Sequence, residues 1–267
     1  MTDSAHGIVT TATDGVLSIT IDRPERKGAI DPPAVRNIVE TLEAAAHDDS
    51  LRVVVITSSG EDFCTGADIV ASSSREGDKP RPGNLQRRTA MQAHRLIAVL
   101  LEIQLPVVSV VRGWAAGLGC EIALASDFVV AAETANFWLP FTKRGFTPDS
   151  AATWIIPRLI GVARAKEMLL LGRPMTGEAA AKAGLIFQAV PEVELETAAR
   201  ELTTELQNAA TVAIGLTKRA IHAGLSSGVV DAMEHEALAL ELSSRTSDFR
   251  EGLAAFKERR DPDFTGR

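Results

Sequence analysis

Two glycine-containing loops, each following an apolar run, have backbones suited to binding an anion in this 267-residue chain. Residues 63–69 (FCTGADI) contain Gly66, which permits a turn that exposes the N–H of Ala67. Residues 113–124 (GWAAGLGCEIAL) predict a helix that begins near Leu118. Unpaired N–H groups and the positive end of the helix dipole favour a developing negative charge there. Two such donors around one carbonyl oxygen would stabilise an enolate-like oxyanion.

An acidic residue lies beside the second loop. Glu121 follows Leu118 by three residues, so both lie on one face of the predicted helix. A carboxylate next to an oxyanion site is suited to carry a proton. Structural interpretations are also available, because Asp68 could cap a helix after a plain turn and Glu121 could be a surface residue of a first helical turn. The occurrence of the loop pattern after two buried strands favours the catalytic interpretation.

The composition narrows the possible classes of protein. Apolar residues make up 45%, enough for a buried core, while a net charge of −7, 4% aromatic residues and no tyrosine argue against nucleic-acid binding. The two cysteines, Cys64 and Cys120, form no CxxC pair, which argues against a metal site and fits a reducing compartment. The first 15 residues show no signal-peptide core, and no apolar stretch reaches the roughly 20 residues of a membrane span. We expect a cytoplasmic protein without nucleic-acid or membrane partners.

Apolar and β-branched runs predict strands, and periodic patterns predict helices between and after them. The predicted strands cover residues 15–21, 51–57, 106–111, 128–131 and 186–190. The predicted helices cover residues 32–46, 85–103, 118–125, 149–159, 162–171, 176–183, 194–207, 213–223, 229–244 and 248–259. This order indicates an α/β core over residues 1–200 and a helical region over residues 201–267, where exposed apolar faces would indicate oligomerisation. Residues 71–84, rich in Ser, Gly, Pro and charge, predict a surface loop.

Taken together, these motifs resemble those of the crotonase, or enoyl-CoA hydratase/isomerase, family. Residues 22–30 (DRPERKGAI) resemble its N-terminal motif, and the two glycine loops resemble its two oxyanion motifs. The resemblance continues through residues 148–161, 179–184 and 252–260. It implies a crotonase-like β-β-α spiral core with a C-terminal helical region, assembly into trimers or dimers of trimers, and an acyl-CoA substrate. It implies no metal and no cofactor apart from the coenzyme A of the substrate.

The resemblance also implies roles for single residues. The oxyanion donors fall on the N–H groups of Ala67 and Leu118, and the first catalytic glutamate falls on Glu121. Positions that contact CoA or substrate fall on Arg26, Lys27, Ala29, Ala67, Asp68, Ile69, Val70, Leu118, Phe141 and Arg259. In relatives, the cation at the position of Arg259 reaches CoA phosphate on a neighbouring subunit. The alternative is a solvated helix end.

Phe141 is the main departure from the family pattern. Hydratases of the family have a second glutamate here, and two carboxylates hold and activate the water that adds to the double bond. Asp149, eight residues further on, matches an acid that relatives use to shift double bonds and that an aryl-CoA dehalogenase uses as a nucleophile. The structural alternative is an aspartate stabilised in a first helical turn.

We therefore expect an enoyl-CoA hydratase/isomerase that favours double-bond isomerisation, with Glu121 and Asp149 as its catalytic pair. Two alternatives remain open. One is an acyl-CoA-binding protein without catalysis. The other is an aryl-CoA hydrolase or dehalogenase with Asp149 as the nucleophile.

Overall fold

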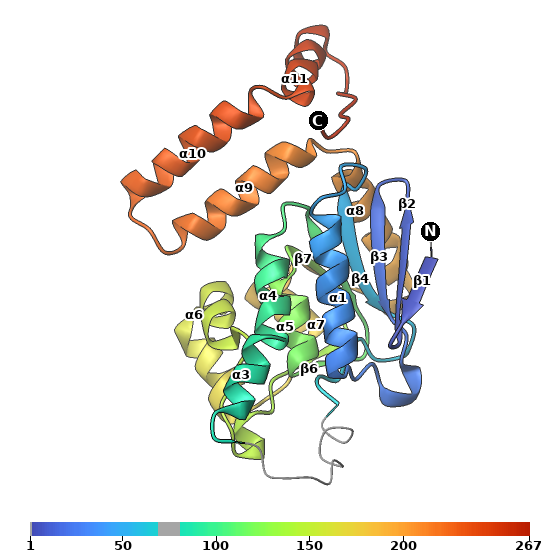
Figure 1. Ribbon diagram of the computed structural model, residues 1–267, viewed down its shortest axis with the longest axis vertical. Helices are drawn as coiled ribbons and strands as arrows, with labels where there is room; N and C mark the ends of the chain where they lie inside the picture. Colours follow the sequence, from blue (N-terminus) through green and yellow to red (C-terminus); the bar gives the residue numbers. More distant parts are fainter. Residues whose placement is uncertain (1, 69–80) are drawn as a thin grey trace.

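The computed structural model describes residues 2–68 and 81–267 and is built around a seven-stranded sheet (Figure 1). The sheet order is β1-β2-β3-β4-β5-β7-β10. The strands are β1 (Thr2–Ala5), β2 (Ile8–Thr13), β3 (Val16–Ile21), β4 (Val53–Ser58), β5 (Val107–Val111), β7 (Phe128–Ala132) and β10 (Gln188–Val190). β1 to β3 form an antiparallel meander, and the pairings from β3 to β10 are parallel. A second sheet contains β6 (Trp114–Ala116), β8 (Asn136–Trp138) and β9 (Met175–Thr176).

The apolar runs form strands because a parallel sheet buries both of its faces. All five residues of β5 are buried, and the five predicted strands are confirmed as β3, β4, β5, β7 and β10. The other five strands were not predicted. β1 (TDSA) is short and polar, β2 (IVTTAT) carries threonines on its less buried positions, and β6, β8 and β9 contain two or three residues each.

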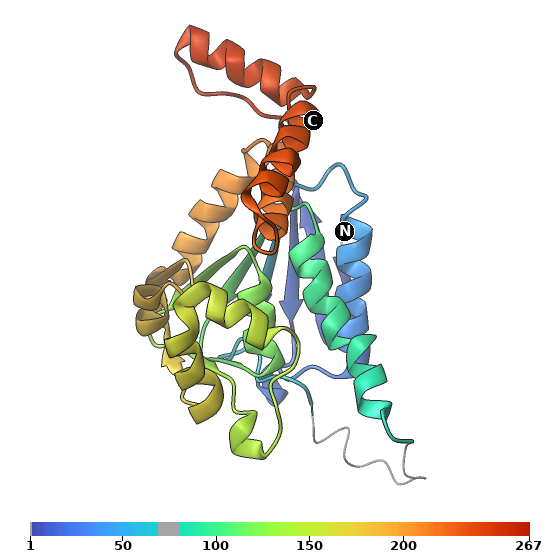
Figure 2. The ribbon, with the colours of Figure 1, turned by 90° about the vertical axis from the view of Figure 1, so that its left-hand side faces the viewer.

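Helices cover both faces of the large sheet (Figures 1 and 2). α1 (Pro32–Ala45) and α4 (Ala93–Glu102) pack against each other on one side, and α8 (Leu195–Gln207) packs against β4, β5 and β7 on the other. The core also contains α3 (Asn84–Ala90), α5 (Leu118–Ala125), α6 (Ala152–Leu171) and α7 (Gly177–Ala183). Short 3-10 helices cover Pro24–Arg26, Thr142–Arg144 and Glu192–Glu194. The single helix predicted over 85–103 is wrong, because Gln92 at φ −127°, ψ −91° separates α3 from α4.

The helix after Asp149 begins later than predicted. α6 starts at Ala152, after Ser150 and Ala151, which both have left-handed backbone angles. Gly161, at φ 73° and ψ 162°, interrupts α6 at the point where the sequence predicts a break between two helices. Asp149 therefore does not occupy the first helical turn, where the structural alternative placed it.

The last three helices project away from the core (Figures 1 and 2). α9 (Thr211–Gly224) and α10 (Val229–Ser243) lie side by side, and α11 (Ser247–Glu258) follows at the outer end. α10 buries none of its residues in this chain, and Val229, Val230 and Leu240 are all more than 60% exposed. The predicted boundary at residue 200 falls within α8, which packs on the sheet. No helix in the described part of the chain is long and apolar enough to cross a membrane.

Candidate active site

The first glycine loop turns the N–H of Ala67 away from its neighbouring strand segment. Ile30 pairs with Ala67 in an isolated parallel bridge. In this bridge the N–H of Ile30 donates to the Gly66 carbonyl over 2.9 Å, and the N–H of Asp68 donates to the Ile30 carbonyl over 2.8 Å. Because the groups on both sides of Ala67 face Ile30, the N–H of Ala67 itself faces the opposite direction. It finds no acceptor among the described residues, and Ala67 is exposed.

The second loop places the N–H of Leu118 at the start of α5. Gly117, at φ 51° and ψ −126°, is held by its N–H, which donates to the Trp138 carbonyl over 2.8 Å. Helix α5 then begins, and the N–H of Glu121 donates to the Gly117 carbonyl over 3.0 Å. Leu118 is the first helical residue, so its N–H has no partner within the helix. It has no other acceptor in the described part of the chain.

Two glycines allow these loops to touch. A Cβ atom on Gly66 would lie 2.9 Å from the Ala116 carbonyl oxygen and 3.4 Å from the Leu118 nitrogen. A Cβ atom on Gly119 would lie 2.1 Å from the Cys64 carbonyl oxygen. The residue before Ala67 thus lies directly against the first N–H of α5. The first loop therefore lies against the start of α5, and each of the two segments carries an N–H without an acceptor among the described residues.

Glu121 lies one turn along α5 and is buried without a partner. The residue is 1% exposed, and neither carboxyl oxygen has a hydrogen-bond partner among the described residues. Burial raises the pKa of Glu121 well above its ordinary value, and the negative charge of Asp149 raises it further. The interpretation of Glu121 as a surface residue is therefore wrong. A carboxyl group with a raised pKa holds a proton more firmly than an ordinary glutamate and is suited to accept one from a substrate.

Asp149 lies close enough to act on Glu121. It is exposed, in the segment that joins the 3-10 helix at Thr142–Arg144 to α6, and its charge contributes to the raised pKa of Glu121. The N-cap position of α6 is Ala151, without a side-chain hydrogen bond, so Asp149 does not cap the helix. The structure thus brings together the two acids that the sequence singled out.

Phe141 is buried, at 8% exposure, and makes an edge contact with Phe146 with ring centroids 5.4 Å apart. Where the family's hydratases have a second carboxylate, this chain has a pair of aromatic rings. Neither ring can accept a proton.

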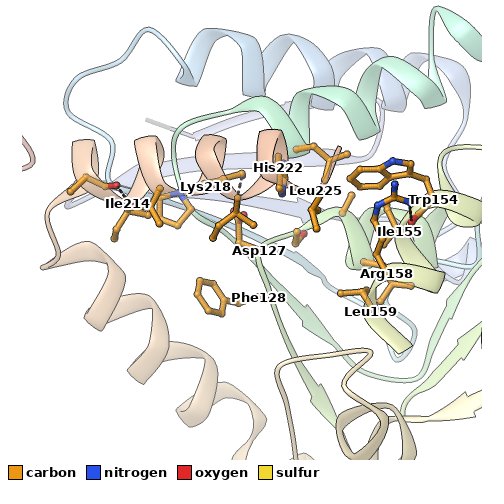
Figure 3. A pocket seen from close by; sticks show the side chains of 18 of the residues that line it. Asp127, Phe128, Trp154, Ile155, Arg158, Leu159, Ile214, Lys218, His222 and Leu225 are labelled. Atoms are coloured by element: carbon orange, nitrogen blue, oxygen red, sulfur yellow. Dashed lines mark hydrogen bonds and ion pairs between the residues drawn. The ribbon is translucent and has the colours of Figure 1, made fainter. Parts of the chain in front are cut away.

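A cavity of about 640 Å³ lies between α9 and the core (Figure 3). Its walls are largely apolar and include Leu124 and Trp154. Leu124 follows Glu121 by one helical turn on α5, and Trp154 lies on the first turn of α6, after Asp149. At one end of the cavity Arg158 lies over the indole ring of Trp154, with 4.1 Å from guanidinium carbon to ring centroid.

An ion pair joins α9 to the core beside this cavity. Lys218 is 6% exposed, and its Nζ donates to Asp127 over 2.7 Å and to the Leu100 carbonyl over 2.9 Å. Burial lowers the pKa of Lys218, and Asp127 opposes this effect. The contact fixes the first helix of the projecting region to the core.

A sequence model of the enoyl-CoA hydratase/isomerase family matches residues 11–267. The chain belongs to this family. It is 37% identical over 265 residues to a probable enoyl-CoA hydratase of Rhodobacter capsulatus, covering 99% of this chain and 100% of the relative. It is 34% identical to the 1,2-epoxyphenylacetyl-CoA isomerase of Escherichia coli, covering 95% and 96%. The solved enoyl-CoA hydratase of Bacillus anthracis superposes with a TM-score of 0.90 at 30% identity, covering 98% of this chain and 100% of that one.

These matches confirm the crotonase-like fold that the sequence resemblance implied. They also confirm an enzyme of the hydratase/isomerase type that acts on CoA thioesters. Relatives named as hydratases and as isomerases both occur, so family membership alone does not choose between the two reactions.

Several of the proposed CoA contacts of this family member lie beside the first loop. Arg26 forms an ion pair with Asp68, which also lies 3.8 Å from a guanidinium nitrogen of Arg23. The Lys27 carbonyl accepts hydrogen bonds from the Thr65 N–H and hydroxyl. These contacts hold Arg26, Lys27 and the half-buried Ala29 against residues 63–68. Ile69 and Val70 lie outside the described residues.

Arg259 is placed apart from the other site residues. It is exposed and ends α11 in a left-handed conformation. α11 lies at the far end of the molecule from α3 and β6 (Figure 1).

Three features near the site were not predicted from the sequence. They are the buried hydroxyl of Ser150, the ion pair that Arg23 makes with Asp68, and the cavity under α9. Gly161 signalled the break in α6, but Ser150 and Ala151 carry no such signal, because serine and alanine seldom adopt positive φ.

Proposed function

We propose that this enzyme shifts the double bond of an enoyl-CoA thioester through an enolate. The thioester oxygen accepts hydrogen bonds from the N–H groups of Ala67 and Leu118. Glu121, as the carboxylate, removes a proton from the α-carbon of a 3-enoyl-CoA, and the electron pair delocalises onto that oxygen. The acid form of Glu121 then delivers the proton to the γ-carbon, which yields the 2-enoyl-CoA and restores the carboxylate. In the alternative route protonated Asp149 delivers the proton, and Glu121 passes the α-proton on to Asp149, so that both groups return to their starting states.

The observation that carries this proposal is the environment of Glu121. Its carboxyl group is buried and unpartnered among the described residues, next to two unpaired N–H donors and under the influence of Asp149. A base with a raised pKa is well matched to a carbon acid whose enolate is stabilised. Proton transfer between two carbons needs no bound water.

Phe141 supports isomerisation over hydration. Addition of water to the double bond is assisted by two carboxylates that hold one water molecule. Buried Phe141, with the exposed ring of Phe146 against it, offers no such group. Asp149 is the remaining acid near Glu121, and it lies on a different segment of the chain.

The rest of the substrate can be placed by the same reasoning. We assign the CoA moiety to the side of Arg26, Lys27 and Ala29, and the acyl chain to the cavity beneath α9. The exposed apolar side chains of α9 to α11 support assembly into a trimer or hexamer, in which Arg259 meets CoA of a neighbouring subunit. The two cysteines are free and buried, which fits the reducing cytoplasm.

Product analysis tests the proposed reaction. The purified enzyme is given a 3-enoyl-CoA and, separately, a 2-enoyl-CoA, and the products are identified by mass and retention time. We expect isomerisation of the first, little hydration of the second, and loss of isomerisation in the Asp149→Asn variant. Robust hydration that survives Asp149→Asn would contradict the proposal.

Hydration is the second candidate, because relatives named as hydratases match the whole chain. The same experiment separates the remaining alternatives. Binding of CoA esters without turnover would indicate a non-catalytic acyl-CoA-binding protein. A covalent adduct trapped on Asp149 would indicate an aryl-CoA hydrolase or dehalogenase.

A further inference from the structure

Ser150 has a buried hydroxyl group that nothing else in the described structure explains. The residue is 2% exposed, and its Oγ has no hydrogen-bond partner among the described residues. Buried hydroxyls are normally paired, since an unpaired one loses its hydration without compensation. In the described part of the chain, five buried side-chain nitrogen or oxygen atoms lack a hydrogen-bond partner, and three of them belong to Glu121 and Ser150.

The backbone at Ser150 is strained as well. Ser150 and Ala151 have φ of 46° and 66°, and they are the only consecutive non-glycine residues with positive φ in the described chain. Side chains other than glycine seldom adopt this conformation, and such strain persists where the surrounding structure holds a residue for function. This turn sets the positions of Asp149 and Ser150 relative to each other.

The turn lies near Glu121. α5 packs against α6, which the turn precedes, and the charge of Asp149 acts on Glu121. α5 also packs against α4, β5 and β6, and among described residues only Asp149 shifts the pKa of Glu121 by its charge. Cys120, adjacent on α5, has a thiol whose pKa is raised by burial first and by Glu121 second, so it stays neutral. Because Ser150 directly follows Asp149 in this turn, its buried hydroxyl is a candidate donor for the Glu121 carboxyl group, which lacks one.

We propose that Ser150 is a positioning residue whose hydroxyl donates a hydrogen bond to the Glu121 carboxylate during turnover. The inference rests on the proposed role of Glu121 as the proton carrier. Glu121 ionises each time it releases its proton, and the hydroxyl then stabilises the charge and holds the carboxylate toward the α-carbon. The acid form of Glu121 needs this bond less, so the contact is strongest in the state that accepts a proton.

Four variants separate this role from a purely structural one. Ser150→Ala removes the donor. Ser150→Gly removes it and also relieves the left-handed strain. Ala151→Gly relieves strain at the next residue but keeps the hydroxyl, and serves as the matched control. Ser150→Cys keeps a side chain of similar shape with a much weaker donor, and replaces Ser150→Ala if that variant folds poorly.

The readouts are the kinetic constants and a titration of Glu121 in the free protein. Carbon-13 labelling of glutamate carboxyl groups, with the Glu121 signal assigned by its absence in Glu121→Gln, gives the titration without any substrate. We expect Ser150→Ala and Ser150→Gly to raise the pKa of Glu121 and to lower kcat about 10-fold or more with little change in KM. The acidic limb of the kcat/KM profile should move to higher pH, whereas Ala151→Gly should match the parent.

An unchanged Glu121 titration in Ser150→Ala, or wild-type turnover by Ser150→Gly, would overturn the inference. Failure of the proposed function looks different. In that case the parent enzyme would not isomerise enoyl-CoA, but the titration of Glu121 in the free protein would still decide whether Ser150 bonds to it.

Discussion

Glu121 should lower the stability of the fold while it serves catalysis. The side chain is 1% exposed, and its two oxygens lack partners among the described residues. An ionised carboxylate in such a place is costly. Replacement of Glu121 by glutamine keeps the shape and removes the charge. We therefore expect Glu121→Gln to be inactive in isomerisation and more stable than the parent at neutral and alkaline pH.

The magnitude follows from linkage between protonation and folding. The pKa of Glu121 in the folded protein is raised above the ordinary value of 4.5, by burial and then by Asp149. Below the unfolded-state pKa, Glu121 is protonated in both states and the free energy of unfolding keeps its full value. As the pH rises through the folded-state pKa, that contribution to the free energy of unfolding is lost. At a pH above both pKa values, each pH unit by which the folded-state pKa exceeds the unfolded-state pKa lowers the free energy of unfolding by about 1.4 kcal/mol. For a chain of this size, that corresponds to about 3–6 °C in Tm.

The assay is thermal or chemical unfolding at about pH 5 and about pH 8, with the parent and the variant measured side by side. Glu205→Gln, at an exposed position of α8, is the matched control and should not change stability at either pH. We expect the advantage of Glu121→Gln to be small at the lower pH and larger at the higher pH. A variant that is less stable than the parent at both values, or an advantage that does not depend on pH, would refute the reasoning.

Three further predictions concern the rest of the site. Asp149→Asn should reduce the rate of isomerisation about 10²–10⁴-fold. Because the variant removes a negative charge near the Glu121 carboxylate, the acidic limb of the kcat/KM profile should also move to lower pH, as measured by initial rates across pH. Gly66→Ala should reduce turnover about 10²–10³-fold. The new Cβ would lie 2.9 Å from the Ala116 carbonyl oxygen and 3.4 Å from the Leu118 nitrogen, and the φ of 98° at this position is strained for alanine. Wild-type rates would contradict the paired N–H site. Thr217→Trp, on the exposed wall of the cavity under α9, should raise KM for long-chain but not short-chain enoyl-CoAs, and Thr204→Trp on α8 is the control. Equal effects on both chain lengths would place the acyl group elsewhere.

The sequence predicted the parts of the site that depend on local backbone chemistry. The turn at Gly66 and the helix start at Leu118 could be predicted because glycine spacing and a change from strand to helix pattern are local signals. The buried strands β4 and β5 were predicted from their continuous apolar runs. These elements account for the positions of Ala67, Leu118 and Glu121.

The parts that depend on distant contacts could not be predicted from these patterns. The spacing of Leu118 and Glu121 predicts a shared helix face, but the burial of Glu121 depends on how α4, α6 and β6 pack around α5. The family resemblance predicted Asp149 as a site residue. The left-handed turn at Ser150 could not be predicted, because it contains no glycine. The strands β1 and β2 were missed because their polar residues hide the alternation on which strand prediction rests.

Exchange of the substrate α-proton in heavy water tests the central claim most directly, because it reports enolate formation whatever the final product. We expect the parent enzyme to exchange the α-proton of a bound acyl-CoA, and Glu121→Gln to slow the exchange at least about 100-fold while CoA-ester affinity stays nearly unchanged. Exchange that proceeds at the parent rate without the Glu121 carboxylate would contradict the account.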